Sequence, residues 1–172
     1  MNGFSELKAS CSGLAGVIAD AVAPETITES PLATIAKLKL LAEHLARCVL
    51  AFEGLKEPEE STQTHRLNIL SNRGFLPTIL LPFFQVLNRE NQESNRTAVN
   101  VHSRATLLVQ LAERLATWFS KSYALYLPPA AKDAEDAEGV FKAICENPPS
   151  EAIRRSVRKA AARRASMIQL SE

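Results

Sequence analysis

Basic residues at helical spacing are the feature of this sequence that most directly suggests a chemical role. The segment from Ser150 to Glu172 carries a formal charge of +4, whereas the rest of the chain carries −3. Cationic side chains repeated along one helix face can follow a line of phosphates, because each contact releases condensed counterions. The basic residues of this segment are Arg154, Arg155, Arg158, Lys159, Arg163 and Arg164.

A helix over this segment is predicted to be amphipathic. Ser150 is a suitable N-cap, and Glu151 is favourable in the first turn. Arg164 falls nearer the apolar side of the helix, which has no Trp or Phe and therefore does not favour membrane insertion. A solvated surface with extra arginines explains the pattern as well as a phosphate-binding face does. The predicted apolar side comprises Ile153, Val157, Ala160, Ala161 and Ile168, and the predicted basic side comprises Arg154, Arg155, Arg158, Lys159 and Arg163.

Arg73, beside Gly74, is a second candidate for phosphate contact. A basic residue at a helix–loop junction can meet phosphate through its side chain and the backbone together. The other basic residues are scattered along the sequence and give no further pattern.

Motifs for catalysis or metal binding are missing from the sequence. It contains no Gly-rich phosphate loop, no HExxH motif, no Cys/His quartet and no GxSxG elbow. The acidic residues between Asp133 and Glu138 are interpreted as a solvated face with no nearby histidine. His44 and Cys48 stand at i, i+4, but two ligands are too few for a metal site, and Cys48 fits core packing better. We therefore expect a protein that is not an enzyme and needs no cofactor or metal ion.

The odd number of cysteines (Cys11, Cys48 and Cys145) and the lack of a CxxC motif favour reduced thiols in a cytoplasmic protein. The first residues do not resemble a secretory signal. No stretch is long and apolar enough to span a membrane.

Apolar periodicity predicts an all-α fold, a compact bundle of about five to seven helices in a single domain over residues 1–172. Residues 150–172 form the basic amphipathic C-terminal helix of that domain. Gly54 and Gly74 are expected to end helices in the left-handed conformation. The polar stretch Arg89–Asn100 is expected to connect two helices. The expected helices cover Phe4–Val22, Ser30–Gly54, His65–Asn72, Thr78–Asn88, Ser103–Leu125, a short segment capped by Asp133, and Ser150 onward.

Three segments resemble the small all-helical subunit of CRISPR–Cas effector complexes. The first is Arg66–Phe84 (RLNILSNRGFLPTILLPFF), where a helix ends in a polar-Gly-apolar turn before a buried helix. The second is Leu111–Ser120 (LAERLATWFS), with a Leu-x-x-Trp-like ending, and the third is Glu151–Arg155 (EAIRR), with an Arg-Arg pair. Pro77 and Pro82 depart from the pattern, and the first helices lie outside it.

The resemblance implies a non-catalytic subunit of an antiviral ribonucleoprotein. Such subunits stack with copies of themselves and with other subunits, and they contact the backbone of guide-paired target DNA or a displaced single strand without reading sequence. The residues predicted to contact the nucleic acid are Arg154, Arg155, Arg158, Lys159, Arg163 and Arg73. Whether the ligand is DNA or RNA stays open. The alternative is a helical adaptor that binds only protein.

Overall fold

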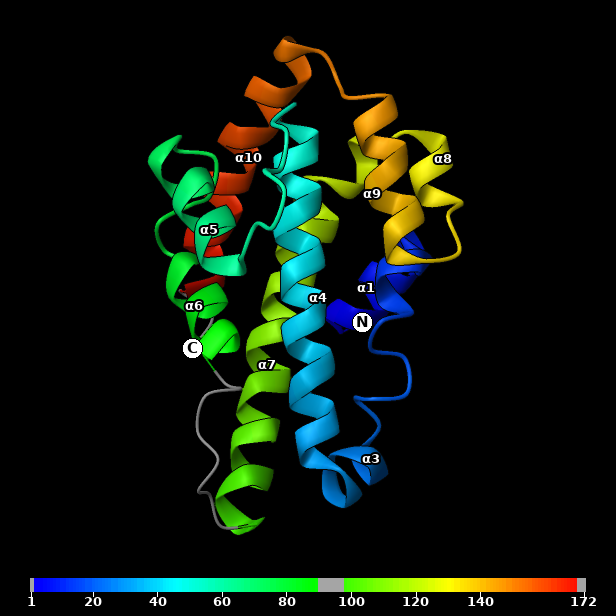
Figure 1. Cartoon of the computed structure of the whole chain (residues 1–172), viewed down its shortest axis with the longest axis vertical. Helices are drawn as coiled ribbons and strands as arrows, with labels where there is room; N and C mark the ends of the chain where they lie inside the picture. Colours follow the sequence, from blue (N-terminus) through cyan, green and yellow to red (C-terminus); the bar gives the residue numbers. More distant parts are fainter. Residues whose placement is uncertain (1, 90–97, 170–172) are drawn as a thin grey trace.

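Helices form all the regular secondary structure in the described part of the chain. The computed structural model describes residues 2–89 and 98–169, and the predicted all-α fold is confirmed (Figure 1). The described residues form more helices than the predicted five to seven, because several short helices were predicted as parts of longer ones or not predicted at all. The α-helices are α1 (Gly3–Ser10), α2 (Ser12–Ala15), α3 (Pro24–Glu29), α4 (Pro31–Phe52), α5 (Gln63–Asn72), α6 (Leu81–Arg89), α7 (Ala98–Ser122), α8 (Pro129–Lys132), α9 (Ala137–Glu146) and α10 (Glu151–Gln169), and a 3-10 helix, η2, covers Ala124–Tyr126.

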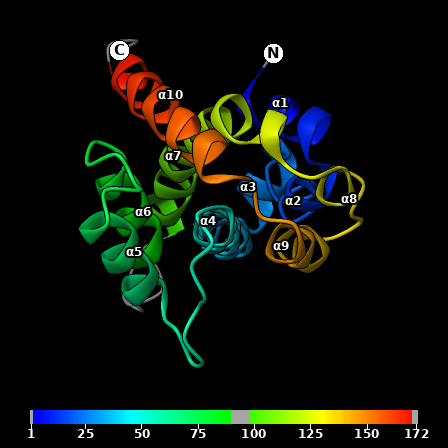
Figure 2. The same ribbon diagram turned by 90° about the horizontal axis from the view of Figure 1, so that it is seen from above.

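The two longest described helices, α4 and α7, form the centre of the molecule. They lie side by side and start at the same end of the bundle (Figure 1). Seen from above, α5 and α6 cover one side of α4, α8 and α9 lie on the other, and α10 packs against α7 (Figure 2). The predicted apolar stripe of α4 is confirmed, because Leu38, Leu45 and Phe52 are fully buried.

An aromatic cluster fills the core where α4 and α7 end. The Tyr123 ring lies edge-on to Phe52, with centroids 5.0 Å apart, and stacks on Phe119 at 5.4 Å. Trp118 meets Tyr123 at 5.3 Å. Aromatic pairs in these geometries each add about 0.5–1.5 kcal/mol beyond the burial of their surface. This cluster fixes the platform on which the C-terminal helix rests.

The N-terminal segment is not the single helix that its periodicity predicted. The helix breaks at Cys11, whose φ of −155° and ψ of 79° lie outside the helical region, and the chain resumes as the short α2. Leu7, Leu14 and Ile18 are nevertheless buried as expected. A glycine explains the close packing of this region: a Cβ on Gly3 would lie 2.2 Å from the Glu113 carbonyl oxygen, so α1 sits directly on α7.

The turns around α5 and α6 follow the sequence prediction closely. Gly54 and Gly74 adopt φ of 70° and 69°, the left-handed conformation expected after a helix. Pro82 stands in the first turn of α6, where its missing N–H is harmless. Most of Arg89–Asn100 lies outside the described residues, and α7 begins at Ala98, before the predicted Ser103.

Asp136, and not Asp133, caps the helix that contains Val140. The Gly139 N–H donates to the Asp136 carboxylate at 2.7 Å. Asp133 instead follows the end of α8. Over the residues described, no helix has the combination of length and apolarity that crossing a bilayer requires.

Candidate nucleic-acid interface on the C-terminal helix

Helix α10 begins after Pro148-Pro149 with the predicted cap. The Ile153 N–H donates to the Ser150 hydroxyl at 3.4 Å, and Glu151 stands in the first turn. The underside of the helix packs on α7. There the Trp118 indole N–H donates to the Ala161 carbonyl at 3.0 Å, and this hydrogen bond helps to fix the position of α10 relative to α7. The buried side chains of this underside are Val157, Ala161 and Ala165.

Two of the predicted phosphate-binding arginines point inward, toward the C-terminal end of α4. The Arg158 Nε lies 3.0 Å and 2.9 Å from the two carboxylate oxygens of Glu53, and Arg158 Nη2 lies 2.9 Å from Glu53 Oε2. The Arg154 Nη1 donates to the Glu53 carbonyl oxygen at 2.8 Å. The sequence reading placed both arginines on the outer face. That placement is corrected, because an acidic residue far away in the sequence holds them against the bundle.

Burial makes the Glu53 side chain an unusual partner. Its carboxylate is fully buried. Loss of hydration raises the pKa of Glu53, and the neighbouring Arg158 charge opposes that rise without cancelling it. The Arg158 guanidinium also lies over the Phe75 ring, 4.6 Å from its centroid. We call Arg154, Arg158 and Glu53 the inner clamp, since together they tie α10 to α4 and to the turn before α6.

Gly54 allows the inner clamp to close. Its φ of 70° is strained for residues with a Cβ, and a Cβ at this position would lie 2.5 Å from the Arg154 Nη1. The Leu55 N–H donates to the Leu50 carbonyl at 3.0 Å and completes the end of α4. The glycine predicted as a simple helix end therefore also makes room for an arginine.

The outer face of α10 carries Arg155, Lys159 and Arg163, which we call the outer stripe. These residues are four positions apart, so their side chains follow one line with steps of about 6 Å. All three are exposed. Arg155 is 68% exposed and its Nη2 lies 3.9 Å from the Glu151 carboxylate. Lys159 and Arg163 form no ion pair with any residue that the structure describes, so their charges face solvent.

Arg73 is exposed at the C-terminal end of α5, as the sequence reading expected. Phe75, two residues further on, contacts Arg158, so the Arg73–Gly74 turn lies beside α10. Arg164 is half-buried on the opposite edge of the helix, next to Ile168 and Trp118. Both residues flank the outer stripe without belonging to it.

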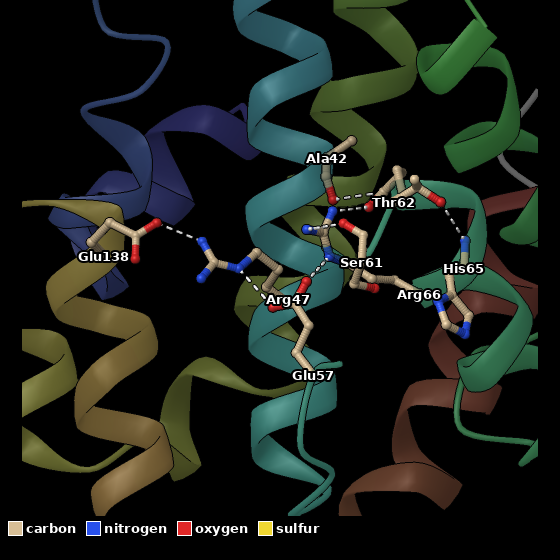
Figure 3. Close-up of polar contacts among 9 residues, drawn as sticks. Ala42, Arg47, Glu57, Ser61, Thr62, His65, Arg66 and Glu138 are labelled. Carbon is tan, nitrogen blue, oxygen red and sulfur yellow. Dashed lines mark hydrogen bonds and ion pairs between the residues drawn. The ribbon is translucent and has the colours of Figure 1, made fainter. Parts of the chain in front are cut away.

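A second charged cluster, which the sequence reading missed, connects α4, α5 and α9 (Figure 3). The Glu57 carboxylate accepts from Arg47 Nε at 3.1 Å and from Arg66 Nε. Arg47 also pairs with Glu138 and lies 4.2 Å from the Phe141 ring centroid. A hollow of about 700 Å³ adjoins the cluster. Both arginines are already paired with carboxylates, so the cluster holds the loop after α4 in place. The residues of this cluster have no regular spacing in the sequence, so the cluster could not be predicted from it.

The acidic residues near Asp133 have a histidine neighbour after all. His44 on α4 lines a hollow of about 360 Å³ together with Glu135, Asp136 and Glu138. Burial lowers the pKa of His44, and its Nδ1 has no hydrogen-bond partner in the described structure. Within the described residues no group of three or more His, Cys, Asp or Glu side chains is arranged to hold a metal ion.

The three cysteines are unpaired. Cys11 and Cys48 are buried in the core and Cys145 is exposed. Burial raises the pKa of the Cys48 thiol, and the residue packs with the apolar stripe of α4, as the sequence reading preferred over a metal ligand.

Comparison with known proteins adds no identification. No family model matches this sequence. Neither a curated protein nor a solved structure matches it. Evidence for its function therefore comes from its own residues.

Proposed function

We propose that this protein is a non-catalytic module that binds the backbone of a nucleic acid along the outer stripe of α10. The observation that carries the proposal is the position of Arg155, Lys159 and Arg163 on the face opposite the buried side of a helix that is firmly held at several points. A rigid row of hydrated cations binds a polyanion with little loss of conformational freedom in the helix itself.

The two faces of α10 differ in a way that supports this proposal, because one face holds the helix in place and the other is exposed. The inner clamp and the Trp118–Ala161 hydrogen bond fix the orientation of the helix, so the outer stripe keeps a constant direction. All three residues of the stripe are exposed, so their charged ends are accessible to a ligand. Contacts of this kind carry no sequence information, since they reach phosphates and not base edges.

The resemblance to CRISPR–Cas small subunits supports a proposal for the complex in which this protein would bind nucleic acid. In that proposal the chain acts in the cytoplasm, beside copies of itself and other subunits of an effector ribonucleoprotein, and holds target DNA or a displaced strand. Arg73 lies in the resembling stretch Arg66–Phe84 and is exposed beside α10, so it is a candidate for an additional phosphate contact.

The test is a salt series with a fluorescent single-stranded oligonucleotide. Replacing the stripe by Arg155→Gln, Lys159→Gln and Arg163→Gln removes three cations. We expect the slope of log affinity against log salt to fall by about 2, at roughly 0.7 per lost phosphate contact on single strands.

A matched control separates the stripe from net charge. Lys8→Gln, Lys37→Gln and Lys56→Gln remove the same charge from three exposed lysines on other elements. We expect this control to leave the slope close to that of the unmodified protein. Equal slopes for both triple variants would contradict the proposal, as would undetectable binding at low salt.

A protein-binding adaptor is the second candidate, and one observation favours it. Leu125 and Tyr126, adjacent on η2, are 72% and 46% exposed, which is a suitable start for a protein contact. This alternative predicts no salt-dependent affinity for oligonucleotides, so the same titration decides between the two candidates.

A further inference from the structure

A hollow between α7 and α10 lies next to the outer stripe and differs from it in chemistry. It has a volume of about 320 Å³, and more of its lining is apolar than polar. Its floor and walls include Trp118, Met167 and Ile168, and its remaining lining residues are Thr117, Lys121 and Arg164. The size is at the lower end of the range for small-molecule pockets, so it has room for one planar ring system.

Two cations flank this apolar surface. The Lys121 side chain is 57% exposed, with its Nζ 3.6 Å from the Glu6 carboxylate. Arg164 is half-buried and makes no hydrogen bond or ion pair to the rest of the described chain. An apolar hollow with a cationic edge favours a ligand that joins a flat apolar group to an anion. A nucleotide unit has this combination, with a base for the hollow and a phosphate for Arg164 or Lys121.

Met167 connects the hollow to the outer stripe. It is 66% exposed and follows Arg163 by one helical turn. A strand whose phosphates run along the stripe therefore arrives at the edge of the hollow. A methionine thioether makes favourable contacts with aromatic rings without demanding a particular ring, which suits binding that does not read sequence. Trp118 forms the floor only, because its ring is fully buried and its N–H is bonded to Ala161.

From this geometry we propose that the ligand is single-stranded and that one of its bases seats in the hollow against Met167. This inference rests on the proposed function and narrows its ligand class, because the bases of a duplex are stacked and paired and cannot reach such a hollow. Single-strand binders generally combine a basic track for the backbone with apolar surfaces for the bases.

The test compares two probes with the same number of phosphates on the full-length chain. One is a fluorescent ten-residue oligothymidine, and the other is a ten-residue strand of abasic sites. We expect the oligothymidine to bind about fivefold more tightly, at the low end of the contribution of one base contact. Met167→Ala should bring this ratio close to 1, and Met167→Leu should largely preserve it. Leu125→Ala, a similarly exposed apolar residue on η2, should not change it.

Each other outcome overturns a defined part of the proposal. Equal, salt-dependent affinity for both probes overturns the base seat and leaves the proposed function standing. A ratio that Met167→Ala does not change overturns the assignment to this hollow. Displacement of the probe by deca-glutamate as readily as by unlabelled oligothymidine would show that an acidic peptide fits as well, and would overturn the nucleotide assignment. Binding of neither probe at low salt overturns the proposed function itself.

Discussion

The inner and outer faces of α10 use the same residue types for different purposes. Arg154 and Arg158 turn toward Glu53 and contact it within about 3 Å, while Lys159, the residue after Arg158, points to solvent. One step along the helix, about 100°, separates a side chain that holds the fold together from one that is free to bind. A count of basic residues does not distinguish the two, so the charge of the segment overstates the charge available to a ligand.

The two faces also differ in their energetics. The outer cations keep their hydration and contribute little to folding. The inner clamp requires a buried carboxylate, and the raised pKa of Glu53 shows that Arg158 only partly compensates for its lost hydration. The clamp therefore serves to fix where α10 docks. Removing one partner is costly, since the other is left without its counterpart.

The largest effect on stability is expected from Glu53→Ala. It leaves Arg158 facing the end of α4 without the carboxylate, while Arg154 keeps its hydrogen bond to the backbone carbonyl of residue 53. We expect a loss of about 3 kcal/mol, the low end for a broken buried pair because Arg158 is 25% exposed. Urea unfolding followed by circular dichroism measures it. Glu151→Ala removes an exposed carboxylate that pairs with Arg154, Arg155 and Arg158 and stands in the first turn of α10, and it should cost no more than about 1 kcal/mol. Similar losses for both variants would contradict the contrast.

A smaller loss, about 1–2 kcal/mol, is expected from Gly54→Ala. The added Cβ faces both an unfavourable backbone conformation and the Arg154 guanidinium. Gly74→Ala is the matched control, because Gly74 has nearly the same φ and a Cβ added there would meet nothing within 4 Å. Thermal unfolding measures the stability of both variants. The additional stability that Gly54→Ala loses relative to Gly74→Ala measures the clash between the added Cβ and the Arg154 guanidinium. Equal losses would mean that Arg154 moves aside at no cost.

The pH dependence of stability distinguishes the contribution of Glu53 in the inner clamp from that of His44, elsewhere on α4. Burial lowers the pKa of His44 below its usual 6.5, so the unfolded chain takes up a proton first as the pH falls. Stability from this residue is present above pH 6.5 and is lost as the pH falls through the folded-state pKa. The raised pKa of Glu53 acts with the opposite sign, because protonation of this carboxyl as the pH falls favours the folded state. We expect His44→Gln to flatten the stability profile below pH 6.5, as measured by urea unfolding at each pH. Parallel profiles for the two proteins would refute this assignment.

Much of the fold could be predicted from the sequence because apolar spacing reports helix faces directly. The stripe of α4, the turn at Gly74 and the start of α10 at Ser150 all follow from local chemistry. The break at Cys11 could not be predicted in this way, since Leu7, Cys11 and Leu14 keep helical spacing across it and are all buried. In this segment, apolar spacing therefore predicts correctly which residues are buried, but it does not show whether they belong to one continuous helix or to two shorter ones.

The candidate interface was only partly predictable for a related reason. Angles around α10 follow from the sequence, but the position of Glu53, 105 residues before Arg158, depends on the tertiary fold. Arg154 shares the buried side by its spacing from Val157 and Ala161, whereas Arg158 lies at the border of that side, where the Glu53 carboxylate decides its direction. Arg155, Lys159 and Arg163 lie opposite the core, so their exposure needed no tertiary information.

The smallest effect on stability, and the sharpest separation of the two faces, is expected from a pair of adjacent substitutions. Lys159→Gln should change the free energy of unfolding by less than about 0.5 kcal/mol, because its side chain is exposed and pairs with no described residue. Its salt slope for oligonucleotide binding should nevertheless fall by about 0.7. Arg158→Gln should do the reverse, with a stability loss of the same order as Glu53→Ala and an unchanged slope under conditions where it is folded. Urea unfolding and the salt titration on both variants measure the two effects. If Arg158→Gln lowers the slope as much as Lys159→Gln does, the inner clamp opens to the ligand, and the face of α10 that binds is wider than the outer stripe.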